Sequence, residues 1–374
     1  MRITAINHDL AKTAPLEFGC DKAQKAIEFH KTLAGYHPTP LVTLDGLAKA
    51  AGVRKLYVKD ESKRFGLNAF KALGGSYAMH CLLDGREECC TFVTATDGNH
   101  GRGVAWAAKM LGQKAVVFMP KGSSQERLEN ILKLGAVAEI TEYGYDDCVR
   151  YARKMAEKNG WLLLQDTAWQ GYETIPAMIM QGYTTMGLEI MEQLGDVVPT
   201  HIFLQAGVGA MAGAMTSFFA DCYKEKRPRI VIVEPDGADC IFRTAEAGDG
   251  MLHFCKELST MMAGLSCGEP CTIGWDIIER YADFAMTCPD SVAADGMRIL
   301  ANPVGNDSRI ISGESGAVTV GAVARIMHHN APMQELLGLT ADSVILCIST
   351  EGDTDRENYQ KIVGCTASCM PGNR

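Results

Sequence analysis

Lys71 is the residue in this sequence whose neighbours most strongly suggest covalent chemistry. It follows Phe70 and opens a helical stretch, and residues 69–75 around it are otherwise apolar or small. Such neighbours would keep water from the ammonium group and lower its pKa, as a lysine that forms a Schiff base requires. The alternative interpretation is a lysine that buries its apolar stem and extends its charge to solvent.

A second distinctive segment is TDGNHG, at residues 96–101. It stands between an apolar strand pattern and a helical pattern, so its backbone N–H groups would lie at a helix N-terminus. Such a position binds anions and suits the carboxylate of a substrate. Asp97 could instead cap the helix and have no catalytic role.

The third segment, AGVGAMAG at residues 206–213, follows the strand pattern HIFLQ. Glycines allow backbone amides to close around a phosphate. Gly207, Gly209 and Gly213 read G-x-G-x-x-x-G, one residue longer than a dinucleotide fingerprint, and no well-placed acidic residue follows about twenty positions later. A nicotinamide dehydrogenase would explain this segment but not the first two.

The elements that must position these segments alternate between strands and helices. Strand patterns occur at KLYVKD, TFVTAT, AVVFMP, VAEIT, HIFLQAG, RIVIVEP and VILCIST. Helical patterns between them predict βαβ units, and hence a mostly parallel sheet with helices on both faces. Ser124 and Glu126 are typical of a helix start, and Gly135 of a helix end. Ligands of such folds bind beyond the carboxyl ends of the strands, where all three segments stand.

Length and charge narrow the class of protein. At 374 residues the chain should divide into two lobes. The net charge of -9 and the absence of a basic stripe argue against a nucleic-acid partner. The N-terminus lacks the apolar stretch of a signal peptide. Residues 197–220 are uncharged and long enough to span a bilayer. The polar breaks at Pro199, His201 and Gln205 instead favour a strand, a loop and a helix, so we expect no membrane partner.

The fourteen cysteines are scattered along the chain. Cys267/Cys271 and Cys365/Cys369 have C-x3-C spacing, but no histidine pair with zinc-ligand spacing accompanies them, so we expect no metal. Small buried side chains in a reducing cytoplasm are the preferred interpretation, and the sequence leaves open whether any two cysteines pair.

Together the three segments resemble the fold type II pyridoxal-phosphate enzymes, the tryptophan-synthase-β family. The resemblance implies two open, twisted, mostly parallel α/β domains with the cofactor in the cleft between them. The large domain would comprise residues 1–70 and 185–374, and the small domain residues 71–184. Lys71 would form the Schiff base with pyridoxal 5′-phosphate.

The same resemblance implies further roles around the cofactor. Asn99 would bind the ring hydroxyl, Glu314 would lie near the ring, and either Ser349 or Thr350 would meet the pyridine nitrogen. His100 is interpreted as a helix-start histidine with a structural hydrogen bond rather than as a general base. The phosphate would be bound by backbone amides at Gly207, Val208, Gly209, Ala210 and Met211. The substrate carboxylate would be bound by Thr96, Gly98 and His100.

Longer strings resemble one branch, the diaminopropionate ammonia-lyases, over residues 35–355. They are KDESKRFGLNAFKALGG, TDGNHGRGVAWAAK, QDTAWQGY, LQAGVGAMAG, GLSCGEP, NDSRIISGESGAV and ISTEGDTD. Members convert both enantiomers of 2,3-diaminopropionate into pyruvate and two ammonia molecules, and the resemblance implies a homodimer in the cytoplasm.

One departure from the wider family suggests how both enantiomers could react. Dehydratases and racemases usually carry Ser-Ser-Gly-Asn-His where this chain has Asp97 at the second position. The two enantiomers present their α-protons to opposite faces, so we expect Lys71 to be the base for the L-isomer and Asp97 for the D-isomer. Asp166 would hold the β-ammonium and supply or shuttle a proton, unless it only caps a strand end.

Two other functions fit the same cofactor site. A serine or threonine dehydratase would use a hydroxyl leaving group. Asp97 and Asp166 argue against this function, because acidic partners suit a β-ammonium group. A non-catalytic pyridoxal-phosphate-binding protein would show no turnover, so replacing Asp97 would have no effect on activity.

Overall fold

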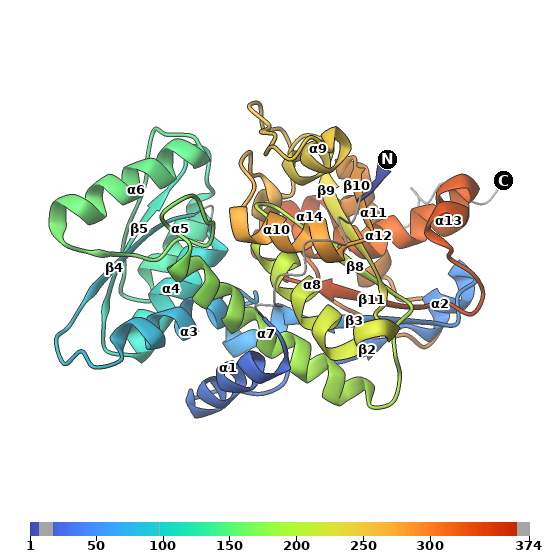
Figure 1. The fold of residues 1–374 in the computed structure, drawn as a ribbon, viewed down its shortest axis with the longest axis horizontal. Coiled ribbons are helices and arrows are strands. Elements are labelled where there is room, and N and C mark those ends of the chain that lie inside the picture. Colours follow the sequence, from blue (N-terminus) through green and yellow to red (C-terminus); the bar gives the residue numbers. More distant parts are fainter. Residues whose placement is uncertain (7–17, 97, 365–374) are drawn as a thin grey trace.

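Two sheets of mainly parallel strands, each covered by helices, form the two lobes of the molecule (Figure 1). The computed structural model describes residues 1–6, 18–96 and 98–364. The larger sheet has seven strands; in spatial order they are β1 (Arg2–Ala5), β10 (Phe284–Cys288), β9 (Arg229–Pro235), β8 (His201–Gln205), β11 (Val344–Ser349), β3 (Lys55–Asp60) and β2 (Leu41–Thr43).

The five inner strands of the larger sheet run parallel, and only its edges, β1 and β2, pair antiparallel. The sequence patterns did not predict β1, β2 or β10. Strands β8 and β11 are buried at every residue, because helices cover both faces of the sheet.

The smaller sheet forms the other lobe and is wholly parallel. Its strands, in spatial order, are β6 (Val137–Ile140), β5 (Lys114–Met119), β4 (Thr91–Ala95) and β7 (Leu162–Leu163). All four fall inside residues 71–184, the range expected for the small domain. The two-residue strand β7 is too short to produce a sequence pattern.

Helices surround both sheets, and α7 runs along the boundary between the lobes, where it packs against α1, α3 and α8 (Figure 1). The α-helices are α1 (Cys20–Thr32), α2 (Asp45–Ala51), α3 (Ala72–Leu83), α4 (Asn99–Met110), α5 (Gln125–Leu132), α6 (Tyr145–Asn159), α7 (Thr174–Leu194), α8 (Ala210–Tyr223), α9 (Cys240–Ala247), α10 (Thr272–Tyr281), α11 (Asp290–Ala301), α12 (Glu314–His329), α13 (Ala331–Leu337) and α14 (Arg356–Val363). Short 3₁₀ turns are η1 (Glu61–Gly66), η2 (Lys224–Lys226) and η3 (Ala263–Leu265).

The α/β architecture predicted from the sequence is confirmed. Ser124 caps α5, since its hydroxyl accepts a hydrogen bond from the Arg127 N–H. Helix α4 begins at Asn99, inside the TDGNHG segment that the sequence analysis placed at a helix N-terminus. The uncharged run at 197–220 contains β8, a loop and most of α8, and no helix in the described ranges has the length and apolar character to cross a bilayer.

A disulfide between Cys20 and Cys222 joins the start of α1 to the end of α8. The expectation of small, unpaired buried cysteines therefore does not hold for this pair. The two residues are 202 positions apart, so only the tertiary fold brings their Cα atoms to 6.1 Å. Cys267 and Cys271 are buried, whereas Cys365 and Cys369 lie outside the described residues.

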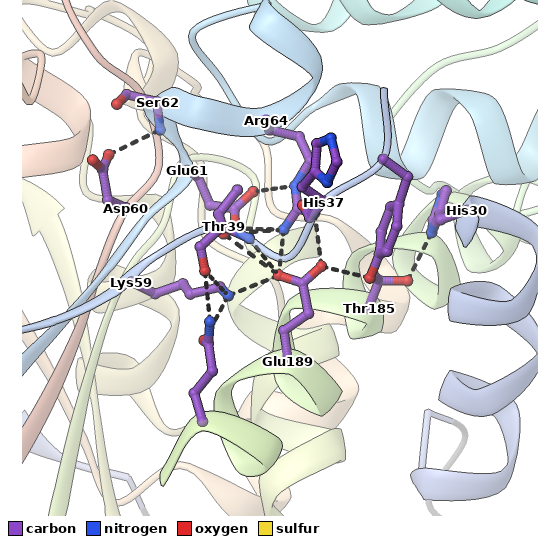
Figure 2. Close-up of polar contacts among 12 residues, drawn as sticks. His30, His37, Thr39, Lys59, Asp60, Glu61, Ser62, Arg64, Thr185 and Glu189 are labelled. Carbon is purple, nitrogen blue, oxygen red and sulfur yellow. Dashed lines mark hydrogen bonds and ion pairs between the residues drawn. The ribbon is translucent and has the colours of Figure 1, made fainter. Parts of the chain in front are cut away.

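A buried ion network fixes η1, the turn that precedes Lys71 (Figure 2). Glu189 on α7 accepts from Arg64 Nη1 at 2.7 Å and from Lys59 Nζ at 2.7 Å. Arg64 Nη2 also donates to Glu61 Oε1 at 2.7 Å. All four charged side chains have no exposed surface, and their two positive and two negative charges balance. The network therefore anchors the end of β3 to α7.

Candidate active site

One cavity is lined largely by the segments that follow strands β3, β4, β7, β8 and β11. In both sheets these segments leave the carboxyl ends of parallel strands, which is where ligands of open α/β sheets bind. The cavity thus lies where the two sheets face each other, and the three segments singled out in the sequence all reach it.

Lys71 lies at the N-cap of α3, and its loop is tied to the end of β11. The Phe70 N–H donates to Thr350 O at 3.1 Å, and the Gly352 N–H donates to Asn68 O at 3.0 Å. Lys71 Nζ lies 5.4 Å from the centre of the Phe70 ring and 5.9 Å from that of Tyr183. Its side chain is only 20% exposed, so the lysine lines the cavity rather than extending to bulk solvent.

Asp166 is the buried carboxylate that faces Lys71. It follows β7, and its Oδ2 pairs with Lys71 Nζ and lies 3.7 Å from His100 Nδ1. Burial alone would raise the pKa of Asp166, but His100, the Lys71 charge and the Lys71 hydrogen bond lower it to about 2. Asp166 is therefore ionised at neutral pH and serves as an acceptor for a positive charge.

His100 takes the structural position that its place at a helix start predicted. Its Nε2 is 2.8 Å from Leu164 O, a carbonyl, which can only accept, so Nε2 carries the proton. Burial lowers the pKa of His100, which is consistent with a neutral ring whose Nδ1 faces Asp166. The histidine also lines the cavity, so a structural hydrogen bond and ligand contact are compatible.

The conformation of the loop after β4 is stabilised by a hydrogen bond within the loop. Thr96 Oγ1 accepts from the Gly98 N–H at 3.0 Å, and Gly98 has φ +148°, a conformation that favours glycine. Asn99 opens α4, and its Nδ2 donates to Glu351 Oε2 at 2.5 Å. Thr96 and Asn99 line the cavity. Asp97, the expected base for the D-isomer, lies outside the described residues.

Residues 207–211 form the glycine loop between β8 and α8, and all five line the cavity. Gly209 has φ +92° and directly precedes α8, so the loop lies at a helix N-terminus, a position that favours anions. A Cβ on Gly207 would lie 3.1 Å from Cys267 Sγ and 3.2 Å from Gly264 O. Gly213 has a different role, since it packs against Gly274 of α10.

The end of β11 separates the two hydroxyls proposed for the pyridine nitrogen. Thr350 lines the cavity, and its Oγ1 accepts from Gln205 Nε2 at 3.0 Å. Ser349, one residue earlier, projects to the opposite side, where its Oγ donates to Ser312 Oγ at 2.7 Å. Glu314 is buried behind the cavity, 3.4 Å from Arg127 Nη2.

Several residues of the cavity were not assigned a role from the sequence. Among them are Gln205 at the end of β8, Glu351 after β11 and Tyr145 at the start of α6. Gln205 and Glu351 stand in strings that resemble the family, LQAGVGAMAG and ISTEGDTD, but nothing local distinguishes them from structural polar residues. Tyr145 follows β6 and is distant in sequence from the three segments, so only the packing of α6 brings it to the cavity.

Comparison with known proteins identifies the family. The family model for pyridoxal-phosphate dependent enzymes matches residues 32–349. Diaminopropionate ammonia-lyase of Escherichia coli K12 is 51% identical over 373 residues, which cover 94% of this chain and 93% of that protein. The chain belongs to the diaminopropionate ammonia-lyases, a branch of the pyridoxal-phosphate dependent enzymes.

Solved structures of this lyase family have the same fold. The Escherichia coli diaminopropionate ammonia-lyase in complex with an aminoacrylate-PLP azomethine reaction intermediate superposes with a TM-score of 0.91 at 50% identity, covering 97% of this chain and 96% of that one. The same lyase in complex with D-serine gives 0.92 at 49% identity, with the same coverage. The fold type II assignment made from the sequence is therefore confirmed.

The cavity residues of this lyase-family chain fit pyridoxal phosphate. The glycine loop at the start of α8 suits a phosphate, since a helix N-terminus favours a dianion. Gln205 Oε1 is buried beside the cavity and has no hydrogen-bond partner among the described residues. Lys71 lines the cavity and would supply the amine that the cofactor aldehyde requires.

Proposed function

We propose that this chain eliminates ammonia from both enantiomers of 2,3-diaminopropionate and yields pyruvate and two ammonia molecules. The observation that carries the proposal is the buried Lys71–Asp166 pair at the cavity, between the glycine loop and the TDGNHG loop. An amine and an ionised carboxylate stand together there, as α-proton removal and β-ammonium binding require. The D-serine complex of the Escherichia coli lyase supports a site that accepts a D-amino acid.

The cofactor would be held by residues from both lobes. The amides of residues 207–211 would bind its phosphate, and Asn99 its ring hydroxyl. Thr350 is favoured over Ser349 for the pyridine nitrogen because Thr350 faces the cavity. Pyridoxal phosphate, when bound, supplies the aldehyde for the Schiff base and a ring that delocalises the electrons released from the α-carbon.

The chain's own residues would divide the remaining work. Thr96, Gly98 and His100 would hold the substrate carboxylate at the start of α4. Lys71 Nζ would remove the α-proton of the L-isomer, and the Asp97 carboxylate that of the D-isomer from the opposite face. The assignment to Asp97 rests on its sequence position, between Thr96 and Gly98.

Asp166 would bind the β-ammonium of the substrate. Its ionised carboxylate currently pairs with the Lys71 ammonium, so it is placed to accept another positively charged nitrogen when Lys71 is engaged elsewhere. Without the Lys71 charge, burial would favour its neutral form. Asp166 can therefore move a proton to or from the β-nitrogen, which leaves as ammonia; the second ammonia is released when the product hydrolyses to pyruvate.

Pyruvate release by the cofactor-loaded protein tests the proposal. We expect rapid turnover of D- and L-2,3-diaminopropionate and little turnover of D- or L-serine. Turnover of serine or threonine alone would instead indicate a dehydratase, and bound cofactor without any turnover would indicate a non-catalytic binding protein. We also propose that the chain acts as a cytoplasmic homodimer, as its family resemblance implies; light scattering would measure its mass.

A further inference from the structure

Glu351 connects three of the segments that bound the cavity. It follows Thr350 at the end of β11, lines the cavity and is 2% exposed. Its backbone forms an antiparallel bridge with Ala69, two residues before Lys71. Its backbone oxygen also accepts from the Gly313 N–H at 3.0 Å. The residue thus touches the Lys71 loop and the segment that leads into α12.

The Glu351 side chain accepts hydrogen bonds at both oxygens. Oε2 accepts from Asn99 Nδ2 at 2.5 Å and from Thr354 Oγ1 at 3.3 Å. Oε1 accepts from the Ser315 N–H, in the first turn of α12, at 3.1 Å. A carboxylate meets this demand because it has acceptors only. A glutamine at this position would place its NH2 group against one of the two donors, either Asn99 Nδ2 or the Ser315 N–H.

The packing leaves little room for another arrangement. A Cβ on Gly313 would lie 3.1 Å from Glu351 Cγ, and one on Gly316 would lie 3.0 Å from Glu351 O. The start of α12 therefore approaches Glu351 closely because glycines stand there. A carboxylate near a helix N-terminus is further favoured by the helix dipole.

The charges near Glu351 also come from both lobes. Arg127, on α5, lies 3.4 Å from Glu314 and 3.5 Å from Thr354 Oγ1 through Nη2. Burial, and then the charge of Glu351, raise the pKa of Glu314 to about 8, against the opposing charge of Arg127. Arg127 therefore lies close to the carboxylate of Glu314 and to Thr354, the residue that donates to Glu351.

We propose that Glu351 is a positioning residue that fixes the Asn99 side chain against the end of β11, and so joins the ring-binding residues of the two lobes. Asn99 comes from the lobe of the smaller sheet, and Thr350 from the larger sheet. A fixed Asn99 amide binds a cofactor without first losing rotational freedom, which raises affinity. The inference rests on the proposed function only in that Asn99 contacts the cofactor.

Cofactor affinity of the Glu351→Gln variant tests this role. Pyridoxal phosphate is titrated into apoprotein, and binding is followed by visible absorbance. We expect Glu351→Gln to raise the Kd at least about tenfold, the loss of one charge-assisted hydrogen bond. Glu357→Gln is the matched control, since Glu357 is exposed on α14 and pairs with Lys361; its Kd should stay within about twofold of the parent value.

A double-mutant cycle separates positioning from an independent contact. If Glu351 acts through Asn99, Glu351→Gln should weaken binding no further when Asn99 is already alanine. Losses that multiply, or an unchanged Kd in Glu351→Gln, would overturn the inference. Where Glu351→Gln fails to fold, Glu351→Asp replaces it, because aspartate keeps two acceptors on a shorter side chain; its smaller loss should likewise vanish in the Asn99→Ala background.

These outcomes are distinct from those of the turnover assay. A parent protein that releases no pyruvate, together with a weakened Kd in Glu351→Gln, would refute the proposed reaction and leave the positioning role supported. An active parent protein with an unchanged Kd in Glu351→Gln would support the proposed reaction and refute the positioning role.

Discussion

At the scale of single residues, Lys71 and Asp166 depend on each other. Asp166 is buried, and the Lys71 ammonium beside it stabilises its ionised form. The lysine lies at the cavity wall, beside the rings of Phe70 and Tyr183, rather than in solvent. Removing the amine would therefore remove both the proposed covalent attachment point and the charge that stabilises a buried carboxylate.

Lys71→Ala should abolish turnover, with kcat lowered at least about a thousandfold. The protein should also lose the cofactor link to the chain that borohydride reduction makes permanent, which mass spectrometry detects. Lys63→Ala is the control, since Lys63 is an exposed lysine of the same sequence segment. A reducible link that persists in Lys71→Ala would refute the assignment of Lys71.

Asp97→Asn should separate the two enantiomers. If Asp97 is the base for the D-isomer, kcat/KM for D-2,3-diaminopropionate should fall about a hundredfold, and that for the L-isomer by less than about threefold. Asp84→Asn, at the exposed end of α3, serves as the control. Equal losses for the two enantiomers would contradict the two-base model.

At the scale of elements, the turn between β8 and α8 depends on one left-handed residue. Gly209 has φ +92°, and a Cβ there would lie 3.1 Å from Ile241 Cδ1. Any other residue would have to shift the turn, and with it the amides of the preceding loop. The conformation of Gly209 thus determines where the amides proposed to bind the phosphate lie.

Gly209→Ala should therefore lower pyridoxal-phosphate affinity as well as stability. We expect a cost of roughly 1 kcal/mol in the free energy of unfolding from the backbone conformation. Gly160→Ala is matched in conformation, since Gly160 has φ +67° at the end of α6 with no atom within 4 Å of its would-be Cβ. Both variants should lose stability in denaturant titrations, and only Gly209→Ala should bind the cofactor more weakly.

At the scale of the whole molecule, the sequence predicted what local patterns encode. The strand–loop–helix order, the small neighbours of Lys71 and the glycines after β8 are all visible within a few residues of one another. The disulfide between Cys20 and Cys222 is not, because its partners are 202 positions apart. Glu351 escaped notice for the same reason, since its contacts with Asn99 and Ser315 exist only after the lobes pack.

The buried ion network links these scales, because it secures the approach to Lys71 through contacts between distant segments (Figure 2). Glu189 on α7 binds both Arg64 and Lys59, with no exposed surface on any of the three. Burial would raise the pKa of Glu189, but the hydrogen bond and charge of Arg64, with those of Lys59, lower it to about 2. Folding therefore favours the ionised carboxylate.

Glu189→Gln should destabilise the protein by roughly 3 kcal/mol at pH 7, because two buried cations lose a shared partner. The carboxylate has a depressed pKa in the folded state, so its contribution is complete above its ordinary value of 4.5 and is lost as the pH falls toward about 2. Denaturant titrations from pH 7 to 3 should thus show a steep acid loss in the parent protein and a shallower one in Glu189→Gln. Glu192→Gln, exposed on the same helix, should match the parent at every pH; parallel pH profiles for all three proteins would show that Glu189 does not act as a buried anion.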